Sequence, residues 1–401
     1  MTAAPGPARG ADPGKRPPLR MLFVNSGMLG HAAVAGLFVD VARRIPGLDA
    51  THINLSDDLT LAERAIRRVL SLPWSPKTGW AGNLDLRRWR QELNVGLLAR
   101  RRIVAAERAG HYDMMHFHTQ ATAYACLGRL RTTPAIVSID ATQQIASLEA
   151  ASAIGRMSYA PNMIHDGRVF RAAAAITVTS EWAAKDLRAH YPECSERVHV
   201  MPYPVQVWGR PEWMAERAGR ATSRRVSPTR VLFIGGDFPR KGGFDLLEAW
   251  RVGRFADRAV LDLVTDWPIA AADLPQGVGV VRGIRPHTSA WTELWRQADV
   301  FAMPTRHEAF GLVFQEAAAA GLPVLATAIN AVPEIVLDGV TGLLVAPGDR
   351  EGLVAGLRAL IDDPTRRERL GRAAMHRVRA DASPEQYAAR LATVISRITT
   401  I

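Results

Sequence analysis

Short apolar runs alternate with longer helix-like stretches along almost the whole of this 401-residue chain. Such alternation is typical of parallel α/β structure, because a helix after each strand returns the chain to the starting edge of the sheet. The predicted strands of the first half are Leu22–Asn25, Thr51–Leu55, Asp113–Phe117, Ala135–Ile139, Ala175–Thr179 and Arg197–Met201. The second half restarts with RVLFIGG at Arg230 and continues with Val260–Thr265, Val278–Arg282, Asp299–Met303 and Pro323–Ala326.

The chain divides into two similar halves, separated by a proline-rich stretch and the basic run RAGRATSRRVSPTR. The openings RMLFVNSGMLGH and RVLFIGGDFPRKGG both run from a basic residue through an apolar strand to a glycine turn. This weak internal repeat favours two Rossmann-like domains over one large sheet. We predict a disordered tail (1–19), a first domain (20–205), a linker (206–229) and a second domain (230–383). A helix over 384–401 is expected to complete the first domain.

The composition is that of an ordinary globular protein, with 48% hydrophobic and 22% charged residues. The two cysteines, Cys126 and Cys194, provide no disulfide framework and favour a cytoplasmic protein. The net charge of +11 favours anionic partners such as nucleotides, nucleic acid or acidic lipid surfaces. Met21–Val39 has no formal charge, but polar residues and glycines interrupt it. We interpret it as a strand, a turn and a helix from about His31, rather than a membrane span or signal peptide.

Several common ligand motifs are missing from the sequence. No G-x-G-x-x-G follows a predicted strand and no G-x-x-x-x-G-K-[ST] occurs, so a dinucleotide dehydrogenase and a P-loop NTPase are unsupported. No Asp-x-Asp pair and no His/Cys group with zinc spacing occurs either. The sequence therefore predicts no metal site and no cofactor.

Two glutamates bracket a glycine turn in HEAFGLVFQEAAAAGLPVLAT, where Glu308 and Glu316 lie eight positions apart. The preceding strand ends at the loop Thr305–Gly311, and ligands of open α/β sheets bind beyond the carboxyl ends of strands. A helix that starts near Gly311 would direct its free N–H groups towards phosphate or sugar oxygens. The two carboxylates suit a grip on hydroxyl groups of one elongated ligand. The alternatives are two surface charges, or an acid/base pair of the glycosidase type.

This stretch, together with VPEIVLDGVTGLLVAPGD, resembles the Glu-x7-Glu region of retaining GT-B glycosyltransferases of family 4. The resemblance extends from Arg20 to the C-terminus and is looser in the first half. It implies an α/β fold of GT-B architecture, with two Rossmann-like domains facing a central cleft. It also implies that Glu308 holds hydroxyls of a donor sugar, helped by the backbone amides of Phe310 and Gly311, while Glu316 binds the ribose and Leu312 lies at the donor site.

The second glycine turn, GGDFPRKGG, would supply positive charge to the same site. Arg240 and Lys241 follow a predicted strand, where two cations would stabilise a departing nucleoside diphosphate. The family usually has arginine directly after the first glycine, Gly235, and lysine five positions later. Here Gly236 takes the arginine place, so whether Arg240 replaces that arginine stays open. The alternative for the pair is an exposed basic turn.

The first domain and one further loop add weaker candidates. By the same resemblance, NSGMLGH is the glycine loop near the donor phosphates and the acceptor, MHFHTQ places a histidine beside the donor sugar, and RGIRP recognises the base. A histidine at a strand end is also commonly structural. The residues concerned are Gly27, Gly30, His31, His118 and Gly283, with Asp140 of SIDAT expected on the acceptor side.

The resemblance implies a metal-independent retaining transferase, expected to move a hexose from a nucleotide-sugar to an acceptor hydroxyl. The acceptor would be a saccharide or a lipid-linked group, in cell-envelope, polysaccharide or glycolipid synthesis. A GT-B-fold sugar-nucleotide epimerase or hydrolase is the first alternative. A non-catalytic nucleotide-sugar-binding protein is the second.

A basic segment of the first domain suggests a further partner. Between Thr60 and Gly110, eleven Arg or Lys residues face four acidic ones, and Trp74, Trp80 and Trp89 lie among them. Segments such as LAERAIRRVL combine an apolar stripe with a cationic face, which suits an anionic membrane surface at the inner face of the membrane. A solvated basic face, or a groove for an acidic saccharide, is the alternative. No recognised module supports nucleic-acid binding.

Overall fold

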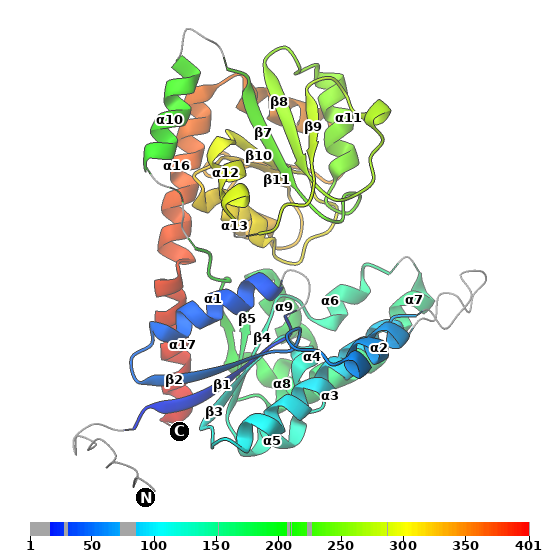
Figure 1. Ribbon diagram of the computed structural model, residues 1–401, viewed down its shortest axis with the longest axis vertical. Helices are drawn as coiled ribbons and strands as arrows, with labels where there is room; N and C mark the ends of the chain where they lie inside the picture. Colours follow the sequence, from blue (N-terminus) through cyan, green and yellow to red (C-terminus); the bar gives the residue numbers. More distant parts are fainter. Residues whose placement is uncertain are drawn as a thin grey trace, which may run out of the picture.

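A computed structural model describes residues 17–27, 31–72, 86–150, 152–206, 209, 211–222, 227–286 and 288–400. They form two six-stranded parallel sheets, stacked in Figure 1 with the second domain above the first. The first sheet contains β1 Leu19–Asn25, β2 Leu48–Asn54, β3 Met114–His118, β4 Ala135–Ile139, β5 Ala175–Val178 and β6 Val198–Val200. The second contains β7 Thr229–Ile234, β8 Ala259–Val264, β9 Val278–Val281, β10 Val300–Met303, β11 Val324–Thr327 and β12 Gly342–Val345. All the predicted strands and the α/β fold class are confirmed, whereas β12 was not predicted.

The strand order places the ligand crevice of each sheet. The first sheet has the order β2-β1-β3-β4-β5-β6 and the second the order β12-β11-β10-β7-β8-β9. The order reverses between β1 and β3 in one sheet and between β7 and β10 in the other. Ligands of such sheets bind at this reversal, beyond the carboxyl ends of the strands.

Helices cover both sheets, and many begin at a side-chain cap such as Thr60, Ser180 or Asp349. Those of the first half are α1 His31–Arg43, α2 Leu61–Leu70, α3 Arg87–Glu107, α4 Gln120–Ala123, α5 Leu127–Thr132, α6 Gln143–Ser147, α7 Ala153–Met157, α8 Ala160–Ala172 and α9 Glu181–His190. The second half has α10 Pro211–Thr222, α11 Gly243–Gly253, α12 Ser289–Gln297, α13 Leu312–Ala319, α14 Val332–Ile335, α15 Arg350–Ile361, α16 Pro364–Asp381 and α17 Pro384–Thr399. Among the residues placed in the structure, no helix has the length and apolar character needed to cross a bilayer.

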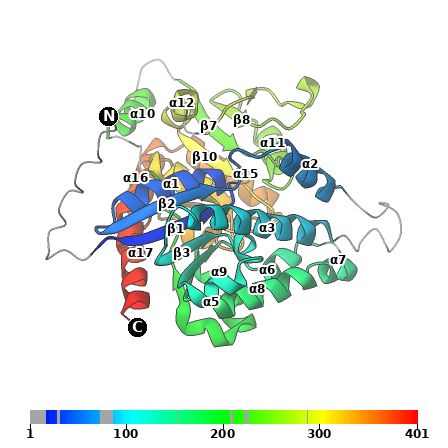
Figure 2. The same cartoon turned by 60° about the horizontal axis from the view of Figure 1, so that its bottom comes forward.

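The last two helices carry the chain back to the first domain. Helix α16 packs on α13 of the second domain, and α17 continues downwards in Figure 1 to lie against α1 (Figures 1 and 2). The buried ring of Tyr387 on α17 lies 5.7 Å from that of Phe38 on α1, and Arg44 Nε donates to Glu385 Oε1 over 2.9 Å. One apolar cluster includes these rings together with Phe310 and Ala331 of the second domain. The two domains therefore share part of their core.

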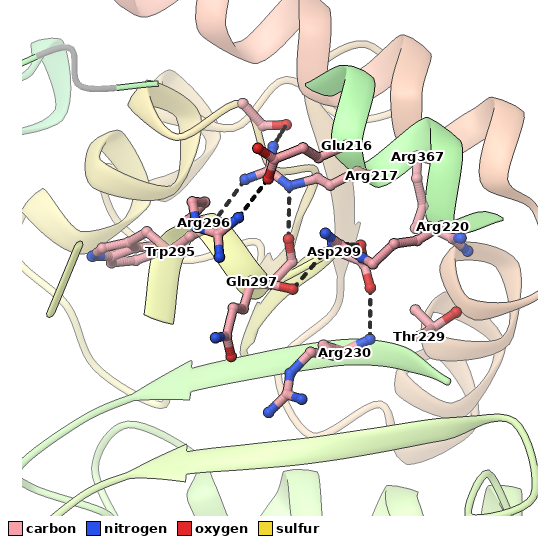
Figure 3. A network of polar contacts seen from close by, with 12 residues as sticks. Glu216, Arg217, Arg220, Thr229, Arg230, Trp295, Arg296, Gln297, Asp299 and Arg367 are labelled. Atoms are coloured by element: carbon pink, nitrogen blue, oxygen red, sulfur yellow. Dashed lines mark hydrogen bonds and ion pairs between the residues drawn. The ribbon is translucent and has the colours of Figure 1, made fainter. Parts of the chain in front are cut away.

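The segment expected to be a linker contains a helix, α10, that is docked on the second domain (Figure 3). The Arg217 guanidinium donates to the carbonyl oxygens of Trp295, Ala298 and Ala320 at 2.8–2.9 Å. Arg220 donates to Asp299 Oδ1 over 2.7 Å, and the other oxygen of Asp299 accepts from the backbone of β7. Arg217 therefore satisfies carbonyls at the ends of two helices, and Arg220 pairs with a carboxylate of the second domain.

Glu334 of the second domain forms hydrogen bonds with a helix of the first domain. Its two carboxylate oxygens accept from the backbone N–H groups of Glu181 and Trp182, at 2.8 and 2.7 Å. These are free donors of the first turn of α9, whose positive dipole end favours a carboxylate. Arg377 of α16 donates to the Glu334 carbonyl over 2.8 Å. These hydrogen bonds connect the two domains directly.

Candidate active site

The loops after β7 and β10 meet at an ion pair between Lys241 Nζ and Glu308 Oε2. Their side chains are only 16% and 12% exposed. The approach requires glycine at 242, because φ is +75° there and a Cβ would lie 1.9 Å from the carbonyl oxygen of Pro304. Two residues 67 positions apart thus come together because β7 and β10 are neighbours in the sheet.

Arg240 lies beside this pair and holds the same loop. Its Nε forms an ion pair with Asp237 Oδ2 at 3.0 Å, and its Nη1 donates to the carbonyl of His307 over 2.9 Å. The Arg240 carbonyl accepts from Arg306 N over 2.9 Å and from Thr305 Oγ1 over 3.2 Å. At Gly236 a Cβ would meet nothing within 4 Å. A side chain would therefore have space at position 236, where the family usually has arginine. Arg240 lies in the adjacent turn instead.

Helix α13 begins at the glycine between the two glutamates. Gly311 has φ +93°, and a Cβ there would lie 2.5 Å from the ring of Phe314 and 3.1 Å from Glu308 Cγ. No side chain caps this helix, so its first N–H groups are available to a ligand. Glu316, one turn further, is buried, and burial raises its pKa to about 8. Its carboxyl group makes no side-chain hydrogen bond or ion pair with any other described residue, so this buried acid lacks a protein partner in the described chain.

His118 and Phe310 are linked across the domains by Tyr203. His118 Nε2 lies 3.0 Å from Tyr203 Oη, and the Tyr203 ring contacts that of Phe310 edge-on at 5.7 Å. Both His118 and Tyr203 are buried. His116, two residues earlier on β3, is bonded to Ser138 Oγ at 2.7 Å inside the sheet, and burial lowers its pKa to about 3. His116 is therefore a neutral core residue.

The other predicted residues are placed as follows. Gly27 follows β1 and lies against Ser56. Gly30 and the side chain of His31 lie outside the described residues. Asp140 follows β4 and lines a polar pocket with Thr119, His307 and Ala309. Gly283 follows the edge strand β9, where its N–H donates to Asp266 Oδ1 over 2.9 Å. Gly283 makes no hydrogen bond to Lys241 or Glu308 in the described part of the chain, so a nucleotide that touches all three residues would have to reach from one to the others.

The sequence analysis missed residues that hold these groups in place. Asn330 Nδ2 donates to the Glu308 carbonyl over 3.0 Å, and His307 Nε2 pairs with Glu149 Oε1 of the first domain at 2.6 Å. Tyr203, in the proline-rich stretch PYP, was not singled out either. Only Asn330 had a local signal, as an asparagine before a proline-containing helix start. Among the described residues, no group of three or more His, Cys, Asp or Glu side chains could hold a metal ion.

Two family models match this chain. One, described as Glycosyl transferases group 1, covers residues 269–377, and the other, described as Glycosyltransferase Family 4, covers residues 41–207. Together they match more than half of the sequence and include residues of both domains.

Similar proteins are found by sequence and by structure. Glycogen synthase of Mycobacterium tuberculosis is 27% identical over 376 residues, covering 90% of this chain and 87% of that protein. A D-inositol 3-phosphate glycosyltransferase of Kribbella flavida is 28% identical over 294 residues, covering 68% and 69%. Sucrose-phosphate synthase from Thermosynechococcus elongatus superposes with a TM-score of 0.68 at 18% identity, covering 95% of this chain and 99% of that one. Anabaena HepE in complex with UDP and glucose has a TM-score of 0.64 at 15% identity, covering 94% and 99%. The chain belongs to the group 1 glycosyltransferases of family 4, and its two stacked sheets have the GT-B architecture.

Proposed function

We propose that the chain is a retaining glycosyltransferase that moves a hexose from a nucleoside-diphosphate sugar to an acceptor hydroxyl. The observation that carries this proposal is the Lys241–Glu308 pair at the strand-order reversal, beside the uncapped start of α13. A cation, free helix N–H groups and a carboxylate suit a diphosphate and a sugar ring side by side. The acceptor is a saccharide or a lipid-linked group in cell-envelope, polysaccharide or glycolipid synthesis.

In the proposed reaction the acceptor oxygen bonds to the anomeric carbon as the bond from that carbon to the phosphate oxygen breaks. The acceptor proton passes to the departing phosphate oxygen on the same face, which retains the configuration. Lys241, Arg240 and the first amides of α13 stabilise the charge on the leaving diphosphate, without a metal ion. Glu308 accepts hydrogen bonds from sugar hydroxyls, and His118 lies beside the sugar. No protein nucleophile is needed.

Thermal-shift screening against UDP-, GDP- and ADP-sugars tests the donor, because a bound ligand raises the melting temperature. Product analysis with and without acceptors then separates the candidate functions. Sugar turnover without any acceptor would favour an epimerase or hydrolase. Binding without turnover across many acceptors would favour a non-catalytic binding protein.

A pH-dependence is expected from Glu316. Hydrogen bonds donated by ribose hydroxyls favour the ionised carboxylate, whereas burial in the ligand-free protein raises its pKa to about 8. Nucleotide binding at pH 7 should therefore release a proton, and affinity should increase as the pH rises from 7 to 8. In the ligand-free protein, the same raised pKa makes the contribution of Glu316 to stability decrease as pH rises from about 4.5 to about 8. Calorimetric titration in two buffers of different ionisation enthalpy measures the proton release.

Glu316→Gln is the variant that isolates this effect, because it keeps the shape and cannot ionise. It should lose the proton release and bind the nucleotide about tenfold more weakly, through loss of a charged hydrogen-bond acceptor. Glu293, a half-exposed residue paired with Arg296 on α12, gives the control variant Glu293→Gln. Equal calorimetric signals in both buffers for the wild type, with undiminished affinity in Glu316→Gln, would remove Glu316 from the nucleotide site.

The first domain is also proposed to rest on an anionic membrane surface. None of the residues of α2 is buried; Leu61 is 83% and Val69 55% exposed. The same helix carries Arg67 and Arg68, and α3 alongside it carries Arg100. These three arginines make no ion pair with any other residue in the described part of the chain. Trp74, Lys77 and Trp80 of the basic segment lie outside that part. Apolar and cationic groups on one exposed helix suit a lipid headgroup layer.

Co-sedimentation with phosphatidylglycerol vesicles tests this surface. Binding is expected at low salt and release at high salt, since each basic residue contributes about 1 kcal/mol at an anionic surface. Arg67→Glu with Arg68→Glu should reduce the bound fraction at least tenfold. The control pair is Arg369→Glu with Arg372→Glu on α16, together with neutral phosphatidylcholine vesicles. A wild-type protein that stays in the supernatant at low salt would favour a soluble saccharide acceptor instead.

A further inference from the structure

A polar pocket of about 170 Å³ lies between the domains. Its lining includes the two residues that flank Glu308 in the sequence. Helix α3 lines one side with Arg88 and Glu92, and the loop after β4 adds Asp140. The second domain closes the pocket with His307 and Ala309, on either side of Glu308. A group bound there would thus lie beside the residue proposed to hold the donor sugar. This position fits the acceptor, and the charges of its walls determine which acceptor it suits.

The wall formed by α3 is held from behind by a buried polar network. The Glu92 carboxylate accepts from Asn162 Nδ2 over 2.6 Å, from Gln143 Nε2 over 2.8 Å and from Arg88 Nε over 2.9 Å. Behind it, Asp166 is fully buried and accepts from Tyr124 Oη over 2.7 Å and from Gln143 N over 2.9 Å. All four carboxylate oxygens of Glu92 and Asp166 accept hydrogen bonds, whereas Gln143 Oε1 and Asn162 Oδ1 have no partner among the described residues. Glu92 is therefore used within the protein, and it holds Arg88 at the pocket.

The charges left to face a ligand are mainly negative. Arg88 is already paired with Glu92, and its guanidinium also lies 5.2 Å from the centre of the Tyr159 ring. Glu149 is paired with His307. Asp140 makes no side-chain hydrogen bond or ion pair with any other residue that the structure describes, although it lines the pocket. A phosphate or carboxylate placed here would lie against this unpaired carboxylate, whereas a hydroxyl group would donate to it.

We infer that this pocket takes the acceptor as an uncharged polyhydroxylated ring, such as a neutral sugar or cyclic polyol, and rejects rings bearing phosphate or carboxylate. The ring's hydroxyls donate to Asp140 and accept from Arg88. Repulsion by Asp140 supplies the rejection, because a like-charge contact in a partly buried site is strongly unfavourable. This inference rests on the proposed transferase function and specifies its acceptor class.

Matched acceptor pairs test the inference with the donor selected by thermal shift. The pairs are glucose with glucose 6-phosphate, glucose with glucuronic acid, and myo-inositol with its 3-phosphate. The full-length wild type should have a kcat/KM at least tenfold higher for a neutral member than for its charged partner. Asp140→Asn should lower kcat/KM for the neutral acceptor about tenfold, and Asp140→Lys should reverse or remove the preference. Exposed Asp257→Asn is the control, with melting temperatures to verify folding.

The possible results separate this inference from the function on which it rests. An equal or higher kcat/KM for the charged members, or unchanged neutral-acceptor kinetics in Asp140→Asn, would overturn the acceptor class while leaving the transferase intact. Donor hydrolysis with transfer to none of the neutral members would also overturn it. Absence of any nucleotide-sugar binding, seen by calorimetry without an acceptor, would instead overturn the proposed function itself.

Discussion

Replacing Lys241 with alanine is expected to lower kcat/KM for sugar transfer by about 100- to 1,000-fold. Lys241 offers a positive charge from a turn fixed by Gly242. In the proposed reaction, this charge stabilises the negative charge that the leaving diphosphate gains. Removing it also leaves Glu308 buried without its cation, which should lower the melting temperature. Initial-rate kinetics with the preferred donor, together with thermal unfolding, measure the two effects.

Two further variants separate catalysis from stability. Lys241→Ala combined with Glu308→Gln removes the unpaired charge, so the melting temperature should recover while activity stays low. Arg251→Ala, which removes an exposed cation of α11 paired with Glu248, should leave both quantities near the wild type. If Lys241→Ala retains more than about a third of the wild-type kcat/KM, the leaving-group role of Lys241 is wrong.

Central strands such as β3, β4 and β10 were predictable because they are buried on both faces and therefore appear as mainly apolar runs. The missed strand, β12, shows the limit of this signal. It has four residues, pairs with β11 at the edge of the sheet and is mostly half-buried. Its sequence, GLLV, follows a glycine-rich turn inside the stretch that carried the family resemblance. A short edge strand buries few of its own side chains. Whether it forms is therefore decided by pairing with the strand beside it, here β11.

The meeting of Lys241 and Glu308 could be anticipated from topology alone. Both follow strands that parallel α/β sheets place side by side at a strand-order reversal. The contacts between the domains could not be anticipated in this way. Glu334 accepts from a backbone group 153 positions away, and such a contact depends on the angle between two separately formed sheets. The sequence contains both partners but carries no local pattern that pairs them.

The partners of arginine side chains were the least predictable feature of the sequence. Arg240 was expected to face a ligand, and it does lie at the site, but Asp237 partly neutralises it. The basic run expected as a linker instead contributes Arg217 and Arg220 to a network that docks α10 (Figure 3). A guanidinium can bind a carboxylate, a carbonyl or a phosphate with similar geometry. Its partner is therefore fixed by tertiary structure and not by the residue type.

Glu308→Gln is expected to lower kcat about 100-fold while changing the affinity for the free nucleoside diphosphate less than threefold. The amide keeps the shape of the side chain, so its packing against Gly311 should be unchanged. The Asn330 contact involves the backbone carbonyl and should also persist. The variant loses the ion pair with Lys241 and the negative charge that would strengthen hydrogen bonds from sugar hydroxyls as positive charge develops at the anomeric carbon. Single-turnover rates and calorimetry with the nucleoside diphosphate measure the two quantities separately.

The control for this variant is again Glu293→Gln, because it removes a carboxylate of α12 that is paired with Arg296 away from the Lys241–Glu308 pair. Equal losses in turnover and in nucleoside diphosphate affinity would place Glu308 at the nucleotide rather than at the sugar. Mass spectrometry of the wild type with donor alone addresses the remaining alternative. A covalent sugar adduct on Glu308 would replace the proposed holding role with nucleophilic catalysis, because retention would then arise from two successive inversions.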